Sequence, residues 1–149
     1  MDYSQFRHWS PKEIKQIDKF EQDFVHFKPK GLYFAIGNEW VRHCEDTGFA
    51  PNTYRFEYKL SPQFKPTKIF KLTKDNELDF LKRYGIDRED EQLFTRIRWN
   101  KVSQEYNGIH ITDELVHSKE TNNGLLWRAF DVETLVLWST DAILERVET

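Results

Sequence analysis

The feature that most constrains the fold is the segment 54–60, in which apolar and charged side chains alternate. A period of two is the repeat of a β-strand that buries one face and exposes the other. Sheets of such half-exposed strands are typically antiparallel, because parallel strands are covered on both faces. We therefore expect an α+β fold rather than a doubly wound α/β fold. One face would carry Tyr54, Phe56, Tyr58 and Leu60, and the other Arg55, Glu57 and Lys59.

Short strands and helices alternate along the rest of the chain. Further strands are expected at 32–36, 68–72, 109–112 and 129–138, with 68–72 as the partner of 54–60. Helices are expected at 39–45, 99–106 and from a cap at Thr73 to about 84. A polar loop is expected at 113–124 and a short final element at 142–147. The expected domain is a mainly antiparallel, short-stranded sheet with flanking helices.

The N-terminal part of the chain carries a helix signal. Ser10 and Glu13 have the spacing of a capping box, and Pro11 occupies the first helical position. Apolar side chains then recur every three or four residues, at Ile14, Ile17, Phe20, Phe24 and Phe27. This pattern predicts a helix that ends before Pro29, or a shorter helix followed by extended chain.

The bulk properties fit one domain, 1–149, without a repeat or linker. The net charge of −3 argues against a general affinity for nucleic acid. Four lysines that recur every three residues could follow a phosphate backbone, although strand geometry would scatter them to both faces: Lys65, Lys68, Lys71 and Lys74. The chain shows neither a signal peptide nor an apolar run of the ~20 residues that span a bilayer. A cytoplasmic location is expected.

The common signatures of nucleotide, metal and hydrolase sites are missing. The sequence has no GxGxxG, GxxxxGK[ST], HExxH or GxSxG motif. Its single cysteine, Cys44, excludes an intrachain disulfide and a Cys-rich zinc site. None of the five histidines has a second histidine or a cysteine at tight helical metal-ligand spacing, so no metal is expected.

Three segments taken in order carry a family resemblance. They are 6–10, then 27–35 with Trp40 and Cys44, and finally 99–111 with 130–138. Together they resemble small bacterial and phage-encoded proteins with an ADP-ribosyltransferase-like fold. The resemblance implies a phage- or toxin-related protein that uses NAD as a substrate in the host cytoplasm. Phage proteins that act against host defence belong to this class.

The resemblance also implies a set of site residues. His8 would hydrogen-bond the NAD ribose, with Ser10 as its supporting neighbour. Tyr33 would lie near the nicotinamide, and Gly31 and Leu32 would let the backbone approach the ligand closely. Loss of nicotinamide passes through a cationic ribose, which calls for an aromatic wall, a hydrogen-bonding group and a carboxylate.

The carboxylate departs from the pattern of the family. Related sequences often carry an acidic residue on this strand, at the position where this chain has His110. By the resemblance, His110 would then help to bind the NAD. Asp113 and Glu133 are the candidates to replace that acid, and Glu114 is a further neighbour. The departure puts transferase activity in doubt more than the fold.

Two functions of different classes follow. The first is NAD-dependent transfer of ADP-ribose to a host macromolecule, with a protein acceptor preferred to nucleic acid. The alternative is a non-catalytic nucleotide- or protein-binding inhibitor module on the same fold. Removal of an RNA 2′-phosphate ranks last, because phosphate capture needs clustered arginines and the arginines of this sequence do not converge.

Overall fold

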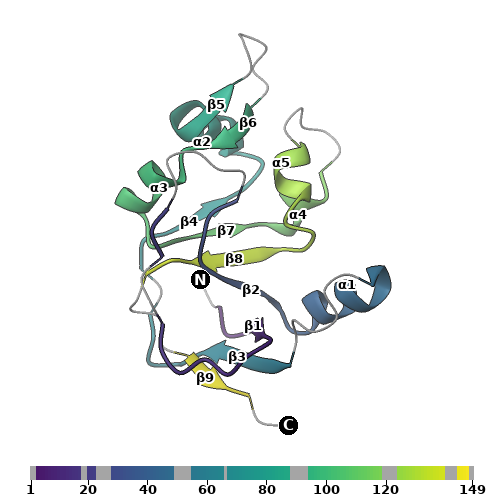
Figure 1. Ribbon diagram of the computed structural model, residues 1–149. Coiled ribbons are helices and arrows are strands. Elements are labelled where there is room, and N and C mark those ends of the chain that lie inside the picture. The colour runs from purple at the N-terminus through teal and green to yellow at the C-terminus, as the bar shows by residue number, and fades with distance from the viewer. Residues whose placement is uncertain are drawn as a thin grey trace.

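The structure is a computed structural model that describes residues 3–17, 20–22, 28–48, 55–65, 67–87, 94–118, 124–139 and 144–147. It is an α+β fold built on a seven-stranded sheet with the order β4-β7-β8-β2-β1-β3-β9 (Figure 1). The strands of this sheet are β1 (Phe6–Ser10), β2 (Leu32–Ile36), β3 (Phe56–Leu60), β4 (Ile69–Leu72), β7 (Gly108–Ile111), β8 (Thr134–Leu137) and β9 (Leu144–Arg146). Only β4 and β7 pair in parallel, which confirms the mainly antiparallel sheet.

The helices and a small hairpin surround this sheet. The helices are α1 (Glu39–Thr47), α2 (Glu77–Tyr84), α3 (Trp99–Glu105), α4 (Asp113–Val116) and α5 (Gly124–Arg128), and the hairpin is β5 (Gly85–Asp87) with β6 (Phe94–Ile97). Figure 1 shows α2, α3 and the hairpin together beyond β4, with α4 and α5 near the end of β7 and α1 beyond β2. No helix of the described segments is long and apolar enough to cross a membrane.

Strand alternation divides the apolar side chains between two clusters. On β7, Ile109 and Ile111 point into the larger cluster, beneath α2, α3, α4 and α5. On β8, Val136 joins this cluster, whereas Leu135 and Leu137 belong to a smaller cluster on the opposite face. The larger cluster is rich in rings, and Trp99, Trp127, Phe80, Tyr84, Phe130 and Trp138 are all buried in it. Large rings therefore supply much of the buried apolar area.

The strand pattern at 54–60 is confirmed over the described residues 56–60, and Tyr54 lies outside them. The expected pairing is wrong. β3 pairs with β1 and β9, whereas β4 pairs in parallel with β7 on the far side of the sheet. Alternation fixes which face of a strand is buried, but it carries no information about the neighbour.

The expected helix after Ser10 is absent from residues 11–17 and 20–22, and residues 18–19 and 23–27 lie outside the described part. Ser10 ends β1, and its hydroxyl donates to the Lys12 carbonyl at 2.6 Å instead of capping a helix. The Ile14 N–H donates to the Tyr58 hydroxyl at 2.7 Å, which ties this segment to β3. One local and one tertiary hydrogen bond have overridden the helix signal.

The expected helices at 39–45 and 99–106 are confirmed as α1 and α3. The helix after Thr73 is also confirmed, although Asn76 rather than Thr73 is its N-cap residue. Asn76 accepts the Thr73 N–H at 2.8 Å, so the two residues form a turn before α2. The expected loop at 113–124 contains the short helix α4, and the expected strand at 129–138 is restricted to β8.

Candidate functional site

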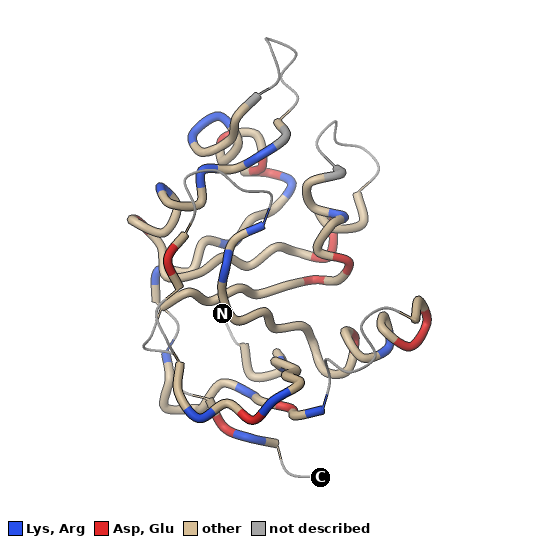
Figure 2. Tube along the Cα trace, in the orientation of Figure 1, with Lys and Arg blue, Asp and Glu red and all other residues tan. Residues whose placement is uncertain are grey.

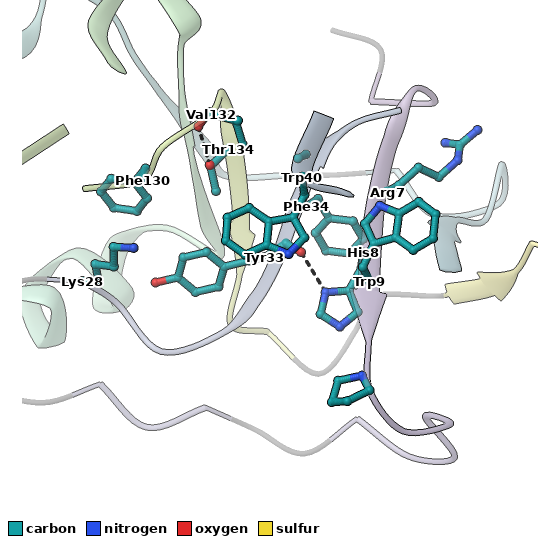
Figure 3. Close-up of a pocket in the computed structure, with 12 residues that line it drawn as sticks. Arg7, His8, Trp9, Lys28, Tyr33, Phe34, Trp40, Phe130, Val132 and Thr134 are labelled. Atoms are coloured by element: carbon teal, nitrogen blue, oxygen red, sulfur yellow. Dashed lines mark hydrogen bonds between the residues drawn. The ribbon is translucent and has the colours of Figure 1, made fainter. Parts of the chain in front are cut away.

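A cavity of about 260 Å³ opens where β1 and β2 separate, beside α1 and the start of β8. Most of its wall is apolar and includes five aromatic rings, and its charged groups lie at the sides (Figure 3). The lining residues are Arg7, His8, Trp9, Pro11, Lys28, Tyr33, Phe34, Ala35, Trp40, Phe130, Val132 and Thr134. His8 and Tyr33, which the resemblance assigns to one NAD site, therefore lie in the same cavity. We call it the aromatic pocket.

The His8 side chain continues the contact between β1 and β2 beyond the last paired backbone residues. The register between β1 and β2 ends at Arg7 and Ala35, and the next contact is from His8 Nδ1 to the Tyr33 carbonyl oxygen, at 2.7 Å (Figure 3). A carbonyl only accepts, so Nδ1 carries the proton. Burial lowers the pKa of His8, and the bond to Tyr33 opposes this only in part. The imidazole is thus neutral near pH 7, and Nε2 has a lone pair with no partner among the described residues.

Tyr33 supplies a rigid wall of the aromatic pocket. Its hydroxyl donates to the Pro29 carbonyl at 2.5 Å, and burial raises its pKa, so the phenol stays neutral. Its ring stacks on Phe130 with centroids 6.3 Å apart and planes 20° apart. Phe130 in turn stacks on Trp127 at 6.5 Å, which connects the pocket wall to the larger core cluster. A wall fixed at both ends offers a planar ligand a surface that is already formed.

The charged side chains at the pocket differ in what holds them. Arg7 contacts Glu57 at 3.3 Å and donates to the Ser4 carbonyl at 2.6 Å, so its guanidinium is committed to β3 and the N-terminal turn. The Lys28 ammonium lies 5.2 Å from the centre of the Phe130 ring. Burial lowers the pKa of Lys28, and the negative charge of Asp131 opposes that shift. Lys28 is therefore a partly desolvated cation beside an aromatic wall.

The carboxylates predicted for the site lie elsewhere. The register places Tyr33, Val136 and Ile109 on one face of the sheet, and it places His110 on the other. There His110 Nε2 contacts the Glu133 carboxylate at 2.7 Å. Burial lowers the pKa of His110, and the bond and charge of Glu133 oppose this. His110 and Glu133 thus form a nearly buried pair that does not line the aromatic pocket.

Asp113 and Glu39 lie near this pair. The other Glu133 oxygen accepts the Asp113 N–H at 3.1 Å, and the Asp113 carboxylate contacts His117 at 2.9 Å in an exposed position. Burial raises the pKa of Glu39, and the charges of Asp113 and Glu133 add to that shift. Acidic side chains therefore gather at the N-terminal end of α1, one residue before the pocket residue Trp40.

The remaining predicted residues have structural surroundings. Ser10 is buried and bonds within its own turn. A Cβ added at Gly31 would lie 2.6 Å from the Leu137 carbonyl oxygen, so the close approach at this glycine is to β8. Leu32 packs against the smaller core cluster. None of the three lines the aromatic pocket.

The lining residues to which the sequence assigned no role in binding include Lys28, Trp40 and Phe130. All three fall inside the segments that carry the resemblance, but only the tertiary fold brings them to the same cavity. A Trp on the short helix at 39–45 was the available signal, because a large apolar ring on a surface helix calls for a partner. Trp40 stacks on His43 at 5.5 Å and faces the pocket (Figure 3).

The pocket can hold a planar ring, accept a hydrogen bond at His8 Nε2 and place a positive charge near the ring at Lys28. No carboxylate lines it in the part of the chain that the structure describes. The described residues also contain no group of three or more His, Cys, Asp or Glu side chains arranged to hold a metal. This combination suits binding of a heteroaromatic ligand better than stabilisation of a cationic transition state.

Comparison of the chain with protein-family models, curated proteins and solved structures finds no match. The chemistry of the site is therefore interpreted from its own residues.

Proposed function

We propose that this domain binds a nucleotide, NAD being the first to test, by enclosing a heteroaromatic ring in the aromatic pocket. One observation carries the proposal: His8, the Tyr33 wall and Trp40 line one cavity with Lys28 at its side. Base–aromatic stacking contributes about 1–3 kcal/mol per ring. A neutral imidazole acceptor adds selectivity for a ligand hydroxyl or amide N–H.

The size of the cavity limits what it encloses. Pockets that surround drug-sized ligands are about 300–1,000 Å³, so about 260 Å³ suits one ring and its sugar. The second half of a dinucleotide would lie outside, along the rim. We infer that the nicotinamide half of NAD, or a mononucleotide, makes the main contacts.

Transfer of ADP-ribose to a host macromolecule is the second candidate, on an ADP-ribosyltransferase-like fold. It is favoured by the shared cavity of His8 and Tyr33. It also needs a carboxylate at the ribose. Glu133 stands in the chain between the lining residues Val132 and Thr134, but its side chain would have to leave the 2.7 Å contact with His110 to reach the ribose. This cost ranks transfer below binding without catalysis.

A protein remains the preferred partner or acceptor. Figure 2 shows Lys and Arg interspersed with Asp and Glu on elements at both ends of the sheet. Among the spaced lysines, Lys74 contacts Glu114 at 3.9 Å, and Lys71 is exposed on β4. A mixed surface of this kind lacks the concentrated positive charge that phosphate backbones select, so nucleic acid is not favoured.

The test is calorimetric titration of the purified protein with NAD. Trp40→Ala should weaken binding about tenfold or more, because it removes a stacking ring. Leu78→Ala is the control, since Leu78 lies on α2 away from the pocket and is 46% exposed. Binding that is absent in the wild type, or equal in both variants, would refute the proposal. NAD labelled on the adenylate side, incubated with cell extract, then separates the candidates: label transfer or nicotinamide release supports the transferase, and binding without either supports the binding module.

A further inference from the structure

An acid in an unusual position stands in the chain between two residues that line the aromatic pocket. Asp131 lies between the lining residues Phe130 and Val132, and its φ of +69° falls in the left-handed region. Asp is one of the few side chains that enter this region, at a cost of about 1–2 kcal/mol. The backbone there bends so that the Asp131 carboxylate meets α1, although α1 is distant in the sequence.

Two basic groups flank the Asp131 carboxylate. His43 Nε2 on α1 lies 3.5 Å from its Oδ2 atom, and the His43 ring is backed by the Trp40 indole. On the other side, Asp131 acts electrostatically on the Lys28 ammonium, which lies over the Phe130 ring. Both rings, Trp40 and Phe130, also line the pocket. The carboxylate thus interacts with two basic side chains, of which Lys28 lines the cavity and His43 stacks on the lining residue Trp40.

We propose that the Asp131 carboxylate stands where an anionic group of the ligand binds, so that the pocket takes a phosphorylated heteroaromatic compound. This inference rests on the proposed function and specifies its ligand. A ring held between the aromatic walls would direct its sugar phosphate toward Lys28 and His43. The phosphate would replace the Asp131 carboxylate at these two groups, and Asp131 would turn out to solvent, where 36% of its side chain is already exposed.

The arrangement explains a selectivity as well as an affinity. With no ligand, Asp131 keeps the basic groups at the mouth partly neutralised, so a lone apolar ring gains nothing from them. A phosphate carries close to two negative charges near pH 7 and forms stronger contacts with cations than one carboxylate does. Compounds that carry both the ring and the phosphate are then favoured over those that carry the ring alone.

The test compares nicotinamide mononucleotide with nicotinamide riboside, which differ only in the phosphate. Asp131→Asn should tighten binding of the mononucleotide about three- to tenfold and leave the riboside unchanged, because it removes one competing charge at a partly exposed site. Lys28→Gln should weaken binding of the mononucleotide by at least the same factor. Asp46→Asn, an exposed acid on the same helix as His43, is the control and should change neither affinity.

Each outcome is informative. If the wild type binds neither compound, the proposed function itself fails. If it binds both, but Asp131→Asn and Lys28→Gln move the two affinities together, the pocket is a ring site and the phosphate inference is overturned. Weaker binding of both compounds to Asp131→Asn would mean that Asp131 attracts the cationic ring, which also overturns it. Thermal unfolding of each variant checks the fold, and Lys28→Gln alone decides the question if Asp131→Asn does not fold.

Discussion

Replacement of Phe130 by Ala tests whether the pocket wall and the core are one packed unit. The Phe130 side chain is 3% exposed and stacks between Tyr33 and Trp127. A ligand site whose wall belongs to the core cannot be altered without a loss of stability. We therefore expect a large effect on the free energy of unfolding even though Phe130 lines an open cavity.

The magnitude follows from the burial and the ring contacts. Deleting a buried Phe side chain costs about 3–5 kcal/mol, which combines the lost transfer free energy and the cavity left behind. Each ring pair contributes about 0.5–1.5 kcal/mol beyond its area. Because one side of Phe130 already faces a cavity, we expect about 3 kcal/mol for Phe130→Ala. Phe130→Leu keeps most of the volume and should cost about 1–2 kcal/mol.

The assay is urea unfolding followed by tryptophan fluorescence, since a domain of 149 residues is expected to unfold in one cooperative transition. Leu78→Ala, on the exposed side of α2, should stay within about 0.5 kcal/mol of the wild type. A double-mutant cycle of Phe130→Ala with Tyr33→Leu should give a coupling of about 0.5–1.5 kcal/mol. A loss below about 1 kcal/mol for Phe130→Ala, or zero coupling, would refute the packing described for the wall.

Three further predictions concern the pH dependence of stability, the close approach of strands at Gly108, and the His110–Glu133 pair. Burial lowers the pKa of both His8 and His110, so the folded state takes up protons less readily than the unfolded state. The stability that these residues contribute should be complete above about pH 6.5 and should decline as the pH falls below it. The free energy of urea unfolding should therefore change less between pH 7.5 and pH 5 in the His8→Asn and His110→Asn variants than in the wild type. Gly108→Ala should cost more than about 2 kcal/mol in thermal unfolding, because the new Cβ would collide with a carbonyl oxygen of β8. Gly48→Ala, at a φ of +69°, has open space around the new Cβ and should cost about 1 kcal/mol. Equal costs for the two variants would contradict the packing of β7 on β8. Glu133→Gln alters the hydrogen bond to His110, so it should destabilise the fold by about 1–3 kcal/mol and leave nucleotide affinity unchanged. If the variant instead lost NAD cleavage without a change in affinity, a catalytic role for this acid would be established.

Local patterns predicted those parts of the fold that local physics decides. The alternation at 56–60 specifies a strand whatever its neighbours are, and the periodicity of 99–105 specifies a helix. The partner of β4 could not be inferred, because register and pairing depend on which strands meet in three dimensions. The helix signal at Ser10 failed because its hydroxyl bonds the Lys12 carbonyl in a local turn and the Ile14 N–H bonds Tyr58, a tertiary partner that the sequence does not reveal.

The site divides in the same way. His8 and Tyr33 share a pocket, as the resemblance implied, since both lie on strands whose ends separate at the same place. His110 and Glu133 lie on the opposite face, because alternation on β7 and β8 turns their side chains away from Tyr33. Asp131 could not be singled out in advance. Its role depends on a left-handed backbone angle and on α1, neither of which is encoded near it in the chain.

The position of β8 has a consequence for how the protein is made. Among the described strands only β9 follows β8 in the sequence, yet β8 lies between β7 and β2 and pairs with both. Until the ribosome has released residues 134–137, β4 with β7 and β2 with β1 and β3 are two separate groups of strands, each with an unpaired edge. Such edges recruit other chains. The two groups of strands therefore cannot join into one sheet before residues 134–137 are available, and a chain that stops before β8 is expected to aggregate.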